Sequence, residues 1–176
     1  MTYLSHNPEE TQRIASDFAK MLFKLETVNC KLETSIIITL EGELGVGKTT
    51  FIQAFAEALG VHEKVKSPTF VLMKDYPITN YLPDRQAGAL RIEKTIRNPQ
   101  SAIHEFRKLY HLDCYRLRDY KDLKVLGIQN ILNNSGNIVL IEWAERVTEI
   151  LPKQHWVVHI DHVTEQERNI TIGYRS

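Results

Sequence analysis

The sequence has few cysteines, no long apolar run and no basic, apolar leader. Only two of its 176 residues are cysteines, Cys30 and Cys114, and their separation matches no metal-ligand spacing, so we expect reduced thiols. No stretch approaches the ~20 apolar residues that a membrane-crossing helix needs. The first residues show no signal-peptide pattern. We therefore expect a cytoplasmic protein without a membrane partner. Its length predicts one domain over residues 1–176.

The sequence also lacks an excess of charge of either sign. It has 22 Lys and Arg residues against 22 Asp and Glu residues, a formal net charge of zero. A protein that binds nucleic acid directly usually carries a basic field, so DNA is not an expected partner. No Asn-Lys-x-Asp motif for reading guanine occurs, which makes a GTP switch a weak alternative.

What the sequence does contain is a phosphate-binding loop. Residues 42–49 match G-x-x-x-x-G-K-[ST] at every constrained position, between a β-branched strand at 36–40 and a helix expected over 50–59. Glycines allow successive N–H groups to face a phosphate, and the helix start adds positive potential. Lys48 is expected on the β- and γ-phosphates and Thr49 on Mg²⁺. The predicted ligands of ATP or ADP here are Gly42, Gly45, Val46, Gly47, Lys48, Thr49 and Thr50.

The remaining periodicity predicts an α/β domain. Asn7-Pro8-Glu9-Glu10 is a typical helix start, and residues 138–141 read as a buried strand. Further expected elements are strands at 71–76 and 109–117, a helix over 119–132 broken near Gly127, a turn at 133–137 and a closing hairpin of 156–160 with 169–174. Strands alternating with helices favour a P-loop NTPase-like three-layer sandwich, with a mostly parallel central sheet and an antiparallel hairpin.

Residues 77–108 break this pattern. They show no sustained period and carry six basic side chains against three acidic ones. Connections of this length are usually functional or disordered. A basic lid, a partner-binding segment and a surface loop without a role all stay open.

A phosphate loop needs acids for Mg²⁺ and a group that senses the γ-phosphate. Glu142 ends the apolar strand, where such an acid belongs, although a surface glutamate is the alternative. Asp113 lies in the strand expected over 109–117, and taken alone it is a weak candidate. Thr69, in Ser67-Pro68-Thr69, is placed like the threonine of a switch loop, although Ser-Pro-Thr is also simply a good turn.

Taken in order, these pieces are more specific than any one of them. The sequence resembles the bacterial TsaE (YjeE) family in four motifs that follow one another along the chain. They are the phosphate-binding loop, Lys-Ser-Pro-Thr-Phe, Tyr-His-Leu-Asp-Cys-Tyr-Arg-Leu and Ile-Glu-Trp-Ala-Glu. The resemblance implies that Asp113 acts near the γ-phosphate and metal, that Glu142 organises Mg²⁺, and that Trp143 packs beside the site. It places Thr69 in a switch-like loop. It also implies nucleotide contacts from Glu10 or Thr11 by the base, and less securely from Arg168.

The same resemblance implies an activity and partners. Members of this family are ATPases of the tRNA threonylcarbamoyladenosine pathway and act with the TsaB–TsaD pair, so tRNA is met indirectly. ATP turnover is expected to support repeated cycles. In family members a short turn joins the segments that correspond to Tyr76 and His111, whereas this chain has a far longer connection. That departure puts the partner surface in doubt.

Two other functional classes stay open. A small-molecule phosphotransferase shares the loop and has an arginine-rich lid, which 77–108 resembles in charge, although no acceptor motif is seen. A nucleotide-binding module without turnover is the second. A zinc site at His155, His159 and His162 is less expected than structural roles for these histidines.

Overall fold

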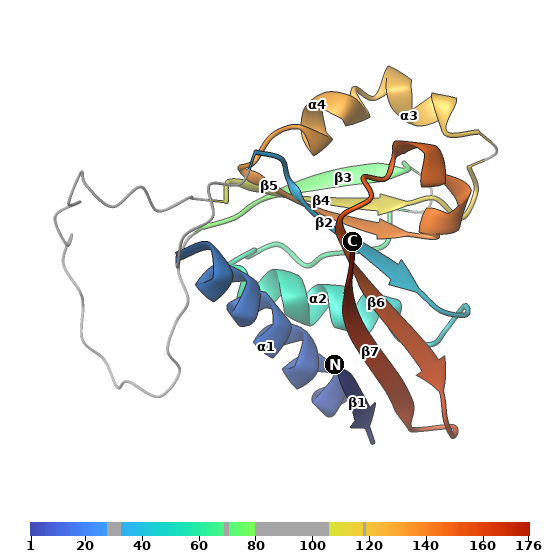
Figure 1. Cartoon of the computed structure of the whole chain (residues 1–176). Helices are drawn as coiled ribbons and strands as arrows, with labels where there is room; N and C mark the ends of the chain where they lie inside the picture. Colours follow the sequence, from blue (N-terminus) through green and yellow to red (C-terminus); the bar gives the residue numbers. More distant parts are fainter. Residues whose placement is uncertain (28–32, 69–70, 80–105, 118) are drawn as a thin grey trace, which may run out of the picture.

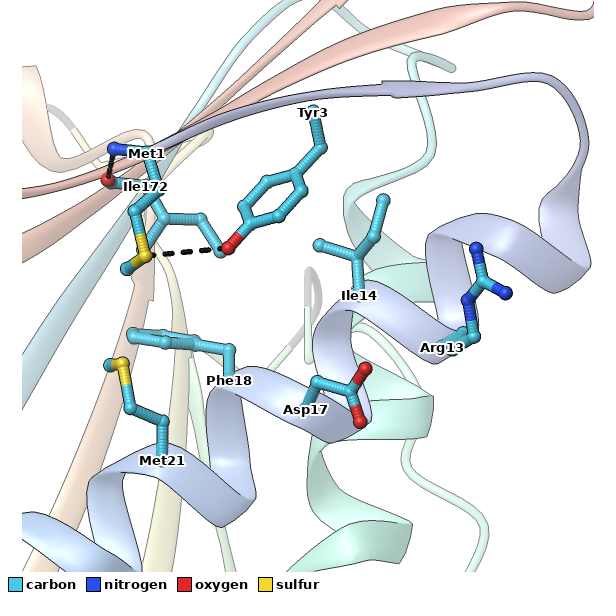
Figure 2. A pocket seen from close by; sticks show the side chains of 8 residues that line it. All are labelled: Met1, Tyr3, Arg13, Ile14, Asp17, Phe18, Met21 and Ile172. Carbon is cyan, nitrogen blue, oxygen red and sulfur yellow. Dashed lines mark hydrogen bonds between the residues drawn. The ribbon is translucent and has the colours of Figure 1, made fainter.

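A seven-stranded mixed sheet lies between two layers of helices (Figure 1). This computed structural model describes residues 1–27, 33–68, 71–79, 106–117 and 119–176. The strands are β1 (Thr2–Ser5), β2 (Ile36–Glu41), β3 (Met73–Pro77), β4 (Lys108–Asp113), β5 (Asn137–Glu142), β6 (His155–His162) and β7 (Arg168–Arg175). The helices are α1 (Pro8–Thr27), α2 (Lys48–Ala58), α3 (Lys121–Val125) and α4 (Ile128–Leu132), with 3-10 turns η1 (Ala144–Arg146) and η2 (Thr148–Ile150).

The strand order is β1-β7-β6-β2-β5-β4-β3. The four middle strands, β6, β2, β5 and β4, run parallel, while β3, β7 and β1 pair antiparallel at the two sides. The expected α/β class, the parallel centre and the β6–β7 hairpin are confirmed. The sheet is more evenly mixed than a mostly parallel one, because β3 and β1 add antiparallel pairs that the sequence pattern did not indicate.

The core has two parts, one on each face of the sheet. Along β5, Ile138 and Leu140 belong to the cluster beneath α1 and α2, whereas Val139 and Ile141 belong to the cluster beneath α3 and α4. All six residues of β5 are buried. A strand covered on both faces reads as a continuous apolar run, which is why residues 138–141 were recognisable from sequence.

Several boundaries differ from the sequence-based expectation. The strand expected to reach Leu117 ends at Asp113, whose carboxylate accepts a hydrogen bond from the Tyr115 N–H at 3.0 Å and so starts a turn. Helix α2 begins at Lys48, two residues before the expected start. The break near Gly127 is confirmed: Gly127 adopts φ 71° between α3 and α4. Strand β1 was not expected at all.

The long basic segment leaves and rejoins the sheet at one place. Pro77 of β3 lies opposite Lys108 of β4, and the Ile78 N–H donates to the Arg107 carbonyl at 3.0 Å. Residues 80–105 lie outside the described part of the chain, so the roles expected of the segment 77–108 stay predictions. Among the described residues, no helix combines the length and apolar character needed to cross a membrane.

Helix α1 is held on the sheet by aromatic contacts. The Phe18 ring lies 5.7 Å from Phe55 of α2 and 5.3 Å from Trp156 of β6, centroid to centroid, and its side chain is 3 % exposed. This one side chain therefore joins α1, α2 and the sheet.

We predict that Phe18→Ala lowers the free energy of unfolding by about 3–5 kcal/mol, because it removes buried aromatic surface and leaves a cavity. Urea unfolding followed by circular dichroism measures the change. Lys20→Ala, on the exposed face of the same helix, is the control and should stay within about 0.5 kcal/mol of wild type. Equal losses in the two variants would show that Phe18 is not a core anchor.

Candidate functional site

The loop between β2 and α2 has a backbone that only glycine adopts at two points. Gly42 has φ 132°, and a side chain there would overlap the carbonyl oxygen of Ile160 in β6. Gly47 has φ 112° and stands at the N-cap of α2. These two positions turn the chain tightly from the strand into the helix, so the first N–H groups of α2 open onto the space beyond the loop.

Lys48 lies inside this turn. Its Nζ donates to the carbonyl oxygens of Gly42 at 2.7 Å and Glu43 at 2.8 Å, and stands 4.7 Å from the centre of the Trp143 ring. Burial lowers the pKa of Lys48, and the nearby charges of Glu142, Asp113 and Glu145 oppose that shift. The amine is thus a partly desolvated cation next to acidic side chains.

Two carboxylates face Lys48 from the neighbouring strands. Leu40, Glu142 and Asp113 are cross-strand neighbours at the carboxyl ends of β2, β5 and β4. Both acids are about 5 % exposed or less. Asp113 accepts hydrogen bonds from the Ser67 hydroxyl at 2.7 Å and from the Tyr115 N–H at 3.0 Å. The register of the parallel strands therefore brings the two predicted acids to one place.

A histidine lies behind the second acid. The Nε2 atom of His111 is 2.8 Å from Oε1 of Glu142, and the histidine side chain is fully buried. His111 precedes Asp113 by two residues on β4, so both side chains leave the same face of the sheet. Sequence reasoning quoted this histidine within a motif but gave it no role.

The loop and the acids share a cavity of about 420 Å³. Of the predicted residues, the cavity is lined by Gly45, Gly47, Lys48, Thr49, Thr50, Asp113, Glu142 and Trp143. Leu44, Ser67 and Tyr115 also line it and were not predicted. Ser67 and Tyr115 stand in the Ser-Pro-Thr and Asp-Cys-Tyr-Arg motifs, so their motif membership was the available signal. Trp143 adopts φ 59°, and its ring lies 5.0 Å from that of Tyr115.

Other predicted residues shape the loop from outside the cavity. Gly42 provides the turn, and the Val46 side chain is buried in the core. Arg168 does not line the cavity: its Nε donates to the Val46 carbonyl at 3.0 Å, and its Nη1 donates to three carbonyls of the β6–β7 turn. Within this structure Arg168 joins the closing hairpin to the loop.

The two N-terminal candidates, Glu10 and Thr11, make hydrogen bonds around the start of helix α1. Glu10 accepts from the His6 N–H at 2.9 Å and donates its own N–H to the Asn7 side chain at 2.8 Å. The Thr11 hydroxyl lies 2.8 Å from that of Ser5. Neither lines the cavity, so their expected contact with a base stays a prediction. Thr69 falls outside the described residues.

Two of the three histidines considered for a zinc site, His155 and His159, have protein partners. Nδ1 of His155 lies 2.9 Å from the Pro152 carbonyl, and His159 lies between Glu41 and Asp161. Among the described residues, no group of three or more His, Cys, Asp or Glu side chains is suited to hold a metal ion by itself.

The cavity combines two kinds of binding chemistry. Helix α2 begins at its wall, and together with Lys48 it provides a positive region that favours phosphate oxygens. Two carboxylates from the neighbouring strands and the hydroxyl of Thr49, next to Lys48 on α2, add the oxygen ligands that Mg²⁺ prefers. Among the described residues that line the cavity, two are acids, so oxygens of a phosphate would complete the ligands of a bound Mg²⁺. The residues present therefore fit a phosphate–Mg²⁺ pair.

Comparison with known proteins gives one consistent result. The family model "Threonylcarbamoyl adenosine biosynthesis protein TsaE" matches residues 5–85 and 82–170. The chain is similar to tRNA threonylcarbamoyladenosine biosynthesis proteins TsaE of Haemophilus influenzae, 34% identical with 91% of this chain and 80% of that protein covered, and of Bacillus subtilis, 34% identical with 94% and 80% covered. The crystal structure of Bacillus subtilis YdiB is similar over 99% of this chain and 84% of that chain, with 28% identity and a TM-score of 0.64.

We predict that Gly42→Ala lowers the free energy of unfolding by about 3 kcal/mol or more, because strain at positive φ adds to overlap with the Ile160 carbonyl. Gly45→Ala is the matched variant: it has φ 80°, but a side chain there meets nothing within 4 Å. Its expected cost is about 1–2 kcal/mol, from strain alone. Chemical denaturation compares the two, and equal costs would contradict the close approach of loop and β6.

Proposed function

Since the chain belongs to the TsaE family of threonylcarbamoyl adenosine biosynthesis proteins, we propose that it is a P-loop ATPase that binds ATP and Mg²⁺ for threonylcarbamoyladenosine formation on tRNA. The observation that carries the proposal is the meeting of Lys48 with Asp113 and Glu142 in one cavity. A glycine-rich loop alone would suit many anions. The pairing of a loop lysine with two buried acids suits a nucleotide phosphate with its metal.

In this proposal the loop binds the phosphates. The N–H groups at the start of α2 donate to phosphate oxygens, and Lys48 exchanges its contacts with the Gly42 and Glu43 carbonyls for contacts with phosphate. Those carbonyls hold the amine in place before the nucleotide arrives, which lowers the entropy lost on binding. The amine also lies 4.7 Å from the centre of the Trp143 ring, where a cation–π contact adds to its placement.

The acids and hydroxyls organise the metal. Thr49, at the second position of α2, and Glu142 are the proposed ligands or organisers of Mg²⁺, with Asp113 close to both. When bound, the metal neutralises charge on the phosphates and orients them. Asp113 is held by Ser67 and Tyr115, so its orientation is fixed from two segments. That arrangement suits a group that positions water for attack.

The proposed partners are TsaB-like and TsaD-like proteins in the cytoplasm, with tRNA met through them. Membership of the family supports this, and the zero net charge favours protein rather than nucleic acid as the first contact. We propose slow hydrolysis by the isolated protein and faster hydrolysis with the partners.

Lys48→Ala should weaken ATP binding about 10- to 100-fold, because a charge-assisted contact to phosphate contributes about 1.5–3 kcal/mol. Isothermal titration calorimetry with ATP measures the affinity. Lys153→Ala, at an exposed turn before β6, removes the same charge outside the cavity and is the control. If Lys48→Ala binds ATP with unchanged affinity, the loop is not the phosphate-binding site.

Glu142→Gln and Asp113→Asn should keep much of the ATP affinity and lose Mg²⁺-dependent hydrolysis. Affinity depends mainly on the loop and Lys48, whereas turnover requires metal and water in line. Phosphate release is to be measured with and without TsaB- and TsaD-like proteins. Glu149→Gln, an exposed acid of η2, is the matched control. If both acid variants hydrolyse ATP at the wild-type rate, the metal site has been assigned to the wrong residues. If the unmodified protein binds ATP but hydrolyses none under any of these conditions, a nucleotide-binding module without turnover is favoured.

A further inference from the structure

Among the described residues, His111 is a buried side chain that contacts a proposed metal-organising acid from outside the cavity. Its side chain is fully buried and does not line the cavity. Its Nε2 lies 2.8 Å from Oε1 of Glu142. A residue in this place has no direct contact with substrate, so any influence on the site passes through the carboxylate.

The hydrogen-bond partners of His111 determine where its proton is. An ionised carboxylate only accepts hydrogen bonds, so Nε2 must donate to Glu142. The Nδ1 atom is buried and has no partner among the described residues. A ring with its proton on Nδ1 instead would leave that N–H without a partner among the described residues and would set two acceptors, Nε2 and Oε1, against each other. The contacts therefore favour the tautomer with a proton on Nε2.

That donor restricts the orientation of Glu142. Each carboxylate oxygen has two lone pairs, and the bond from His111 uses one of those on Oε1. The lone pairs of Oε2 carry no bond from His111, so this oxygen is the one we expect to face a ligand in the cavity that Glu142 lines. Without the bond, the carboxylate is free to turn and to approach the Lys48 amine, whose charge attracts it.

We propose that His111 is a positioning residue, whose Nε2–H fixes the Glu142 carboxylate in the orientation that organises Mg²⁺. This inference rests on the proposed function, since it assumes that Mg²⁺ binds at Glu142. Partners that orient metal ligands typically contribute 10- to 100-fold to metal affinity. The role needs a donor at the position of Nε2 and needs neither a positive charge nor an aromatic ring.

The first test reads the ring directly, in the protein without ligand. Nitrogen-15 NMR of the histidine rings should show a proton on Nε2 of His111, and the signal is assigned by its loss in His111→Gln. A ring whose Nε2 carries no proton would overturn the proposal, whether or not the protein binds nucleotide.

The second test measures the Mg²⁺ concentration that half-saturates the complex with a non-hydrolysable ATP analogue. His111→Gln keeps a donor near the Nε2 position and should remain close to wild type. His111→Leu lacks the donor and should need about 10- to 100-fold more Mg²⁺. His111→Met serves in its place if the leucine variant does not fold. Equal behaviour of the glutamine and apolar variants would overturn the proposal.

A matched control exists in His155. This residue is also buried, has one bonded ring nitrogen and one without a partner among the described residues, but lies at the opposite end of the parallel strands. His155→Leu should leave the Mg²⁺ requirement unchanged, and a rise equal to that of His111→Leu would mean that any buried-histidine loss has this effect.

A double-mutant comparison completes the test. In a Glu142→Gln background, His111→Leu should cause no further loss of Mg²⁺ affinity, and a full second loss would mean that His111 does not act through Glu142. Failure of the proposed function looks different: wild-type protein would bind the analogue neither in Mg²⁺ nor in EDTA, while the ring NMR result would stand by itself.

Discussion

The parallel register of β2, β5 and β4 is the constraint on which the site depends. Leu40, Glu142 and Asp113 stand side by side at the carboxyl ends of these strands. Because the side-chain period of a strand is two, a shift of one residue in β5 would turn Glu142 to the other face and its apolar neighbours with it. The pairing of β5 with β2 on one side and β4 on the other holds its register, and with it the position of the acid.

Charge balance is the second condition. Lys48, Asp113 and Glu142 are all nearly buried, and an ion in such a place is costly without opposite charges and hydrogen bonds. Each acid has a donor, Ser67 for Asp113 and His111 for Glu142, and the lysine has two loop carbonyls. These charged groups are already ordered before a ligand binds. Because protein dipoles have replaced the water around them, little further rearrangement is needed when a charged ligand arrives.

Much of the site followed from local sequence, and some of it did not. The loop motif pointed to Lys48 and Thr49, and an acid at the end of an apolar strand pointed to Glu142; all three line the cavity, and their binding roles stay predictions. Arg168 donates to the Val46 carbonyl of the loop, and its expected nucleotide contact stays a prediction. Strand β1 was missed because its four residues, three of them exposed, have no pattern of their own and are ordered by pairing with β7. Tyr115 and Ser67 carried no signal beyond their motifs.

The sequence by itself determined the elements that depend on neighbours along the chain: the glycine turn into α2, the break at Gly127, the hairpin and the buried strand β5. Local backbone preference and side-chain period are encoded within a few residues, so they are legible without the fold. Only the tertiary structure brought both acids into one cavity with Lys48, set His111 against Glu142 and paired β3 and β1 antiparallel with the sheet. These contacts join residues far apart in sequence, and their geometry depends on strand order and register, which no short segment specifies.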